Sequence, residues 1–449
     1  MTFVYSLFLV AAALLVVSAI GVGTSGAFLP PDRTFFLERL GWGDALGCVV
    51  LIAAVPIALG AGLSPRLVFV ILSAAAVALG RWLRFAPGKN SVLSGKRSAV
   101  LLGAIALGVA VYALRALTEP LWANDFIAIW GLKGKTIFGA LGYPERMRSL
   151  QYAHPEYPLG LPLLYAGIAF LTGRWDDHAM ALLFPFLQAA TLLVLFGWLR
   201  RRGASPAVAG LATATVAWFE PLYSAFLAGM AEVPLAFGML LFGMALADTL
   251  EATDAGAVRR LALASALIAA TKNEGLFLAA VGFLAAIVFG KAVRWRAAAA
   301  ALGPAPLVRS LHLPWRSRIP LADFEWSAFS IDRVWDSLAA AMGLMTRAAW
   351  VGLALVIVLV AVGSRSAAGN RLLALAVCSA LAYLLLPAFA VRGPAWLIET
   401  TFLRTTAALG PLVAAGVAVR FSGASSGSGT GPRASEASPA RPPLSTPAS

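Results

Sequence analysis

Long apolar blocks separated by short polar breaks occupy most of the chain. A membrane-spanning helix needs roughly 17–25 predominantly apolar residues, and many of these blocks reach or approach that length. The pattern therefore predicts an all-α polytopic membrane protein with about thirteen spans, within a range of about 11–14. The expected spans lie near residues 3–22, 45–62, 66–80, 98–116, 179–199, 206–222, 232–249, 259–272, 275–290, 297–309, 338–363, 371–388 and 405–420.

One shorter apolar stretch, 158–172, opens with Pro158 and Pro162 and is followed by a polar turn at Gly173. We expect an interfacial helix there rather than a span, because basic residues accumulate in cytoplasmic loops. If the stretch does not cross and 117–157 lies outside, most of the dense basic loops fall inside. If it crosses, the downstream loops invert and the rule fails repeatedly. The charge pattern therefore favours interfacial helices in the first large outer loop.

The composition agrees with this class. Of the 449 residues, 60% are hydrophobic and 12% are charged, whereas soluble domains carry about 25% charged residues. These proportions exclude an ordinary cytosolic enzyme and a disordered protein. The two cysteines, Cys48 and Cys378, cannot form a disulfide framework or a CxxC metal site. The net charge of +14 follows from basic cytoplasmic loops, so we expect membrane lipids and no nucleic acid as partners.

Three regions follow from the spans and the composition. Residues 1–97 hold N-terminal transmembrane helices, and 98–420 form a transmembrane module with two long outer loops, at about 117–178 and 309–337. Residues 421–449 are rich in Ser, Gly, Pro and Ala and predict a disordered cytoplasmic tail. In this orientation most acidic residues and all three histidines fall on the outer side.

The first outer loop carries Asp125 just beyond a predicted span, beside an apolar run. An aspartate in that place is a candidate base or metal ligand. Ile129, Trp130 and Lys133 share one helical face, so Lys133 or Lys135 could meet an anionic lipid headgroup. The alternative is that Asn124 or Asp125 is the N-cap of an ordinary interfacial helix.

The same loop continues with His154, Glu156 and Tyr157 among three prolines. His154 and Glu156 flank Pro155 and form a compact pair that could share a proton or a metal. Two ligands do not define a metal site. The alternative is a turn that begins a helix and leaves both side chains in water.

Four further charged residues interrupt apolar blocks near the outer side. Glu232 lies at the start of a predicted span, where it is either a carboxylate favoured by the helix dipole or an acid of a functional site. Lys272 and Glu274 separate two apolar blocks, either as a functional pair or as a tight charged hairpin. Arg404 precedes the last span, where it is either a phosphate ligand or an interface anchor.

Taken in order, these motifs resemble one family. An Asp-x4-Trp-x2-Lys loop, a His-Pro-Glu-Tyr-Pro turn, a span-opening Glu, a Lys-Asn-Glu-Gly hairpin and a Thr-Thr-x-x-Arg element are similar to those of bacterial GT-C glycosyltransferases. This polytopic group contains the dolichyl-phosphate-mannose-protein mannosyltransferase and aminoarabinose transferase types. The resemblance covers about residues 98–420 and implies a GT-C-like arrangement.

The resemblance also implies an activity and a set of roles. The donor would be a sugar linked to a polyprenyl phosphate, and transfer to an envelope lipid, glycan or protein would occur at the outer face of a bacterial inner membrane. Asp125 would be the base. The candidate donor-phosphate ligands are Lys133, Lys135, Lys272 and Arg404. The candidate acceptor or metal contacts are His154, Glu156, Tyr157, Glu232 and Glu274.

Two departures from the family pattern leave points open. About four spans precede the catalytic loop instead of one, and Asn124 stands where a second acid would bind a metal. A divalent cation therefore stays a possible cofactor without a defined site. The alternative function is a polytopic transporter or lipid-linked-sugar flippase without glycosyl transfer, which the spans and membrane charges would also fit.

Overall fold

The structure is a computed structural model. It describes residues 2–25, 36–82, 96–144, 147, 154, 156–251, 255–290, 294–311, 327, 329–345, 366–389 and 394–422. Most of these residues are helical, with no β-strand among them, which confirms the all-α class. Beyond Ser422, the predicted disordered tail lies outside the described residues. His312 also lies outside them.

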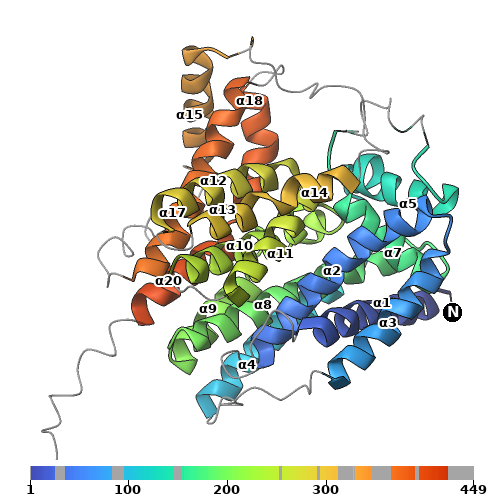
Figure 1. Cartoon of the computed structure of the whole chain (residues 1–449). Coiled ribbons are helices and arrows are strands. Elements are labelled where there is room, and N and C mark those ends of the chain that lie inside the picture. Colours follow the sequence, from blue (N-terminus) through green and yellow to red (C-terminus); the bar gives the residue numbers. More distant parts are fainter. Residues whose placement is uncertain are drawn as a thin grey trace, which may run out of the picture.

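Figure 1 shows the helices coloured along the chain. Their bounds are α1 Thr2–Ser25, α2 Phe36–Gly60, α3 Pro65–Trp82, α4 Lys96–Ala116, η1 Phe126–Trp130, α5 Gly131–Ala140, α7 Gly160–Thr172, η3 Ala179–Leu182, α8 Leu183–Arg201, α9 Pro206–Ala217, η4 Ala225–Leu227, α10 Glu232–Glu251, α11 Ala255–Thr271, α12 Asn273–Phe289, α13 Arg294–Leu302, α14 Pro304–Leu311, α15 Ile331–Met345, α17 Ala367–Leu385, η8 Leu386–Phe389, α18 Pro394–Leu397, η9 Ile398–Phe402, α19 Leu403–Ala407 and α20 Gly410–Ser422.

Seven described helices are long and apolar enough to cross a membrane. They are Phe3–Ser25, Phe36–Gly60, Ala99–Ala116, Ala179–Arg201, Glu232–Glu251, Ala367–Phe389 and Leu403–Ser422. This supports a multi-pass membrane protein, whereas the count of about thirteen is not confirmed. The block expected at 297–309 is broken between α13 and α14 at Gly303 and Pro304, because proline cannot continue the hydrogen-bonding of the helix before it. Part of the block expected at 338–363 lies outside the described residues.

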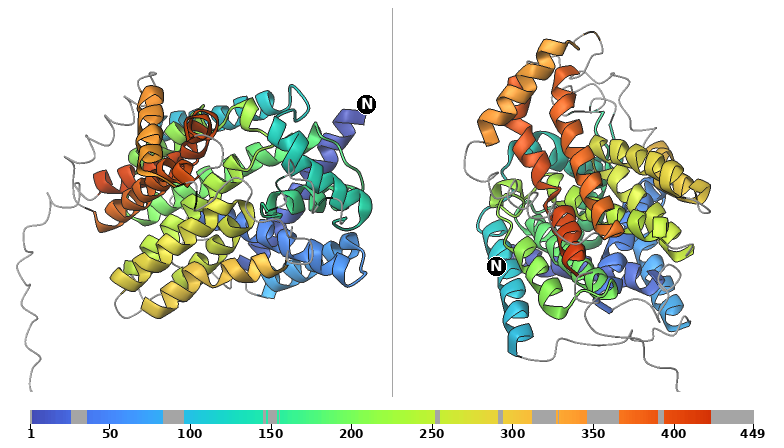
Figure 2. Two further views of the ribbon diagram at one scale, coloured as in Figure 1. Left: turned by 90° about the horizontal axis from the view of Figure 1, so that it is seen from above. Right: turned by 90° about the vertical axis from the view of Figure 1, so that its left-hand side faces the viewer.

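Three groups of helices lie side by side across the molecule (Figures 1 and 2). The first, α1 to α3 with α5 and α7, packs through α2 onto α8. The central group, α8 to α11, includes α10, the most deeply buried of the seven spans. The third, α17 to α20, packs on α10. A helix buried on all sides, as α10 is, sits at the centre of such a bundle.

The contact between α1 and α2 depends on glycines. A Cβ added at Gly21 would lie 1.7 Å from the carbonyl oxygen of Gly43, and one at Gly47 would lie 2.1 Å from that of Val17. Small residues let two helix backbones approach closely, which is how membrane helices gain packing energy. These glycines therefore fix α1 against α2.

A network of arginines and acids joins the C-terminal end of α8 to its neighbours. Arg201 donates to both Glu38 oxygens, at 2.8–3.2 Å, and to Asp248 Oδ2 at 2.6 Å. Arg202 pairs with Asp248 at 3.0 Å. The full set, here called the arginine network, is Glu38, Arg201, Arg202, Asp248, Glu251, Arg260 and Arg371. It ties the ends of α2, α8, α10, α11 and α17 together.

Helix α7 has both of its ends on the side opposite the arginine network. A Cβ at Gly160, its first residue, would lie 2.3 Å from the carbonyl oxygen of Ala270, near the end of α11. Gly173, just past its last residue, lies beside Arg66 at the start of α3. With 13 residues, α7 is about 20 Å long, too short for a bilayer core of about 30 Å. It lies inside the bundle, buried from Gly160 to Phe170, rather than on its surface.

Candidate functional site

Asp125 and Arg404 form an ion pair between segments far apart in the sequence. Arg404 Nη1 donates to Asp125 Oδ2 at 2.8 Å. Asp125 directly precedes the π-helical turn η1, and Arg404 follows the π-helical turn η9 by two residues. Single π-helical turns redirect side chains and occur often at functional sites. Both partners are partly exposed, with 26% and 19% of their side-chain surfaces accessible.

Glu232 is the buried acid of the site. It is the first residue of α10, its side chain is 1% exposed, and its Oε1 lies 2.9 Å from Arg404 Nε. The preceding turn has Gly229 at φ +95°, where an L side chain would be strained, and a Cβ there would meet Phe126 at 3.0 Å. The Tyr165 hydroxyl donates to the Gly229 carbonyl oxygen at 3.1 Å. This turn sets Glu232 beside the segment that carries Asp125.

Lys272 stands between α11 and α12 as the single non-helical residue of the predicted charged hairpin. Its ammonium lies 3.3 Å from Glu232 Oε1 and 2.8 Å from Glu274 Oε1. Gly275 follows, and a Cβ there would lie 2.0 Å from the Ile268 carbonyl oxygen. The glycine therefore permits the tight turn that points Lys272 at Glu232.

These contacts join five residues into one unit, here called the charge cluster. Its members are Asp125, Glu232, Lys272, Glu274 and Arg404. Buried charges are costly unless paired, and an intramembrane ionisable group usually faces a partner or a cavity. Here three carboxylates face two cations, and Glu232 Oε2 has no hydrogen-bond partner among the described residues. The cluster therefore keeps an unused acceptor in its buried part.

A stack of rings stands next to the charge cluster. Tyr157 stacks on Trp130 at 5.4 Å between ring centroids and on His154 at 4.7 Å. The His154 ring Nδ1 lies 2.9 Å from Glu156 Oε1, so the predicted pair does meet. Tyr157 is within electrostatic range of Lys272 and Arg404, which connects the stack to the cluster.

Lys133 is enclosed by this stack. Its side chain is fully buried, its ammonium donates to the His154 carbonyl oxygen at 2.5 Å, and it lies 5.8 Å from the Trp130 ring centroid. Burial lowers the pKa of Lys133 to about 7, against the opposing pull of the Glu156 carboxylate. The face shared by Ile129, Trp130 and Lys133 is thus turned into the protein and not toward lipid headgroups.

The Glu156 carboxyl is shifted in the direction of its charged form. Burial acts to raise its pKa, but the hydrogen bond from His154 and the charges of His154 and Lys133 together hold the pKa of Glu156 below its usual value. His154 has a φ of +45°, uncommon for a residue with a side chain. That backbone geometry presents its carbonyl oxygen to Lys133 and its ring to Glu156.

Lys135 is the predicted site residue that stays away from the others. Its side chain is 61% exposed, and its ammonium lies 3.8 Å from Asp177. Within the described part of the chain, no group of three or more His, Cys, Asp or Glu residues is placed to hold a metal ion. The structure therefore brings together Asp125, Glu232, Lys272, Glu274 and Arg404, with Tyr157 alongside.

Sequence reasoning missed Tyr383. This residue of α17 is buried, its hydroxyl has no hydrogen-bond partner among the described residues, and it lies within electrostatic range of Glu232, Lys272 and Glu274. The only signal in the sequence is one tyrosine within an apolar block, which is equally typical of a core residue.

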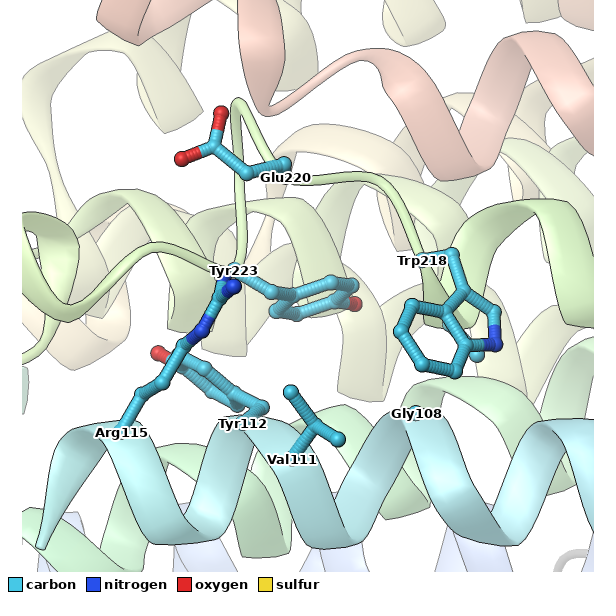
Figure 3. Close-up of a pocket in the computed structure, with 8 residues that line it drawn as sticks. Gly108, Val111, Tyr112, Arg115, Trp218, Glu220 and Tyr223 are labelled. Atoms are coloured by element: carbon cyan, nitrogen blue, oxygen red, sulfur yellow. The ribbon is translucent and has the colours of Figure 1, made fainter.

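A cavity of about 150 Å³ lies elsewhere, between α4 and the segment after α9 (Figure 3). No charge-cluster residue lines it. None of the known protein families, curated proteins or solved structures compared with this chain matches it.

Proposed function

We propose that this protein is a polytopic membrane glycosyltransferase that uses a polyprenyl-phosphate-linked sugar, with Asp125 as the base. The observation that supports this function best is the meeting of five separately predicted residues in the charge cluster. They come from the position just before η1, the start of α10, the α11–α12 connection, the first turn of α12 and α19.

The chemistry of the cluster fits a single displacement. An acceptor hydroxyl attacks the anomeric carbon, its proton passes to the Asp125 carboxylate, and the bond to the donor phosphate breaks. The leaving phosphate gains negative charge, which Arg404 and Lys272 stabilise. Arg404 suits this role because its planar guanidinium can bind a phosphate through two parallel hydrogen bonds.

Both cations are already paired with carboxylates, so donor binding involves an exchange of partners. A phosphate at Arg404 replaces the Asp125 carboxylate, and Glu232 keeps the guanidinium oriented from its buried side. Asp125 then turns toward the acceptor. This exchange couples donor binding to the availability of the base.

The test is transfer by the purified protein in detergent. Radiolabelled polyprenyl-phosphate mannose, glucose and aminoarabinose are supplied with an envelope fraction as acceptor source. We expect Asp125→Asn to lower transfer by about 10²–10⁴-fold, the usual contribution of a general base. Asp177→Asn is the matched control, because Asp177 lies on the same loop but pairs with Lys135 and accepts a hydrogen bond from Trp175 Nε1, outside the charge cluster.

Detergent also separates the two candidate functions. Transfer needs no sealed compartment, whereas a transporter or flippase shows activity only in vesicles. If the Asp125→Asn protein retained full transfer activity, the proposal that Asp125 is the base would be wrong. Lipid-linked-sugar movement in vesicles without any transfer would favour the flippase instead.

A further inference from the structure

The cavity of Figure 3 arises because two parallel helices have different lengths. Helix α4 has 21 residues and α9 has 12. They are in close contact where a Cβ at Gly108 would meet Ala217, the last residue of α9, at 3.0 Å. Beyond that point α4 continues for about 12 Å to Ala116, and the connecting segment after α9 lines the hollow opposite it. The hollow lies between them.

The lining combines apolar walls with a few polar groups. Val111 and Trp218 form part of the apolar wall, and Tyr112 and Tyr223 line it with their rings in tilted contact, 5.3 Å between centroids (Figure 3). Tyr112 is 2% exposed, and its hydroxyl has no hydrogen-bond partner among the described residues. That hydroxyl has no surface accessible from the cavity, so the polar groups that a ligand can reach are those at the rim.

Two opposite charges stand at the rim. Arg115 lies in the last turn of α4, and Glu220 lies on the segment that closes the hollow. Both residues are exposed, and neither forms an ion pair with another residue in the part of the chain that the structure describes. A ligand that carries both a negative and a positive group would complement them.

The position of the cavity indicates where such a ligand comes from. Helix α4 exposes Val100, Leu107 and Leu114, and the neighbouring Trp218 is half-exposed, so this side of the bundle faces lipid tails. The cavity lies near the end of α4, where tryptophan, tyrosine and arginine are typical of the headgroup level. Its volume is about five times the roughly 30 Å³ of a water molecule, enough for a headgroup but not for a whole lipid.

We propose that this cavity binds the headgroup of a phospholipid that carries a phosphate and a primary ammonium. Arg115 pairs with the phosphate, and Glu220 accepts hydrogen bonds from the ammonium. A quaternary ammonium cannot donate hydrogen bonds, and a glycerol headgroup carries no positive charge. The site therefore discriminates among membrane lipids.

The experiment compares three lipids with identical acyl chains on the full-length protein in detergent. Phosphatidylethanolamine, phosphatidylcholine and phosphatidylglycerol are titrated, and bound lipid is counted by native mass spectrometry. We expect phosphatidylethanolamine to bind roughly tenfold more tightly than the other two, about the effect of one hydrogen bond to a charged group. Arg115→Gln and Glu220→Gln should each abolish the preference, and Tyr112→Phe, which removes a hydroxyl that the ligand does not reach, should keep it.

Arg174→Gln is the matched control, because it removes another partly exposed arginine, whose one ion pair among the described residues is with Asp176 at 3.8 Å. It should leave the preference intact. Equal binding of all three lipids would overturn the proposal and identify the cavity as an ordinary annular contact. A preference for phosphatidylglycerol that survives Glu220→Gln would overturn it too, since the cavity would then recognise the phosphate alone.

Discussion

At the scale of single residues, Lys133 shows how far an environment can change a side chain. The sequence placed it on a helical face near Asp125 and made it a candidate for phosphate binding. Its complete burial between Trp130 and Tyr157 leaves it no path to a phosphate in this conformation. We therefore regard Lys133 as a residue that holds the ring stack in place.

Lys133 should make the stability of the protein depend on pH. In an unfolded chain a lysine has a pKa of about 10.4, whereas burial lowers the pKa of Lys133 to about 7. Between these values the unfolded chain binds the additional proton, so the free energy of unfolding rises with pH. Below about pH 7 both states are protonated, and the full cost of the buried charge is present.

The measurement is thermal unfolding in detergent between pH 6 and pH 9.5. Lys133→Met should remove much of the rise in midpoint temperature that the unmodified protein shows above pH 7. Lys135→Met, two residues further along the same helix and exposed, should retain it. Equal slopes for all three proteins would show that Lys133 does not titrate in this range.

At the scale of helices, the close approach of α11 and α12 depends on one glycine. A Cβ at Gly275 would lie 2.0 Å from a backbone oxygen of α11, which has no side-chain freedom to yield. Gly275→Ala should therefore separate the helices and destabilise the protein by about 1–3 kcal/mol, the usual cost of overpacking.

Gly139→Ala is the control for that change. Gly139 is exposed in α5 with nothing within 4 Å of an added Cβ, so alanine there should be neutral or stabilising by up to about 1 kcal/mol. Midpoint temperatures of both variants in the same detergent make the comparison. A Gly275→Ala protein as stable as Gly139→Ala would show that α12 can move away freely.

The helices also show what sequence patterns can and cannot predict. Apolar blocks indicated the membrane class. Charges that interrupt these blocks identified four of the charge-cluster residues as candidates, and the place of Asp125 just beyond a predicted span identified the fifth. The patterns could not predict which residues pair, because Asp125 and Arg404 are 279 positions apart and meet only through packing of whole helices. The hydropathy pattern also failed to separate one helix from the loop that follows it. The predicted block 206–222 stays apolar beyond Ala217, whereas α9 ends at that residue.

At the scale of the whole molecule, charge is collected at two opposite ends. Helix α10 begins at Glu232 in the charge cluster and carries Asp248 of the arginine network sixteen positions later, about 24 Å away. Arginines dominate the second end, as expected for a cytoplasmic side. Arg309 is an exception, because it lies on the side of the charge cluster. It donates hydrogen bonds to the Ala269 carbonyl oxygen and to Asn273 Oδ1, so contacts at the end of α11 account for its position.

This division predicts the orientation of the protein, and two serines provide a matched test. Ser64 and Ser205 are both exposed, and each directly precedes a proline that begins a helix, α3 or α9. Ser64 lies at the end of α2 opposite Glu38, whereas Ser205 lies close to Arg202. The background is Cys378→Ser, in which the remaining cysteine, Cys48, is buried. Ser64→Cys should react with a membrane-impermeant maleimide in intact bacterial spheroplasts. Ser205→Cys should react only after the spheroplasts are permeabilised. Labelling of Ser205→Cys in intact spheroplasts would invert the topology, move the charge cluster to the cytoplasm and exclude a donor presented from the outer leaflet.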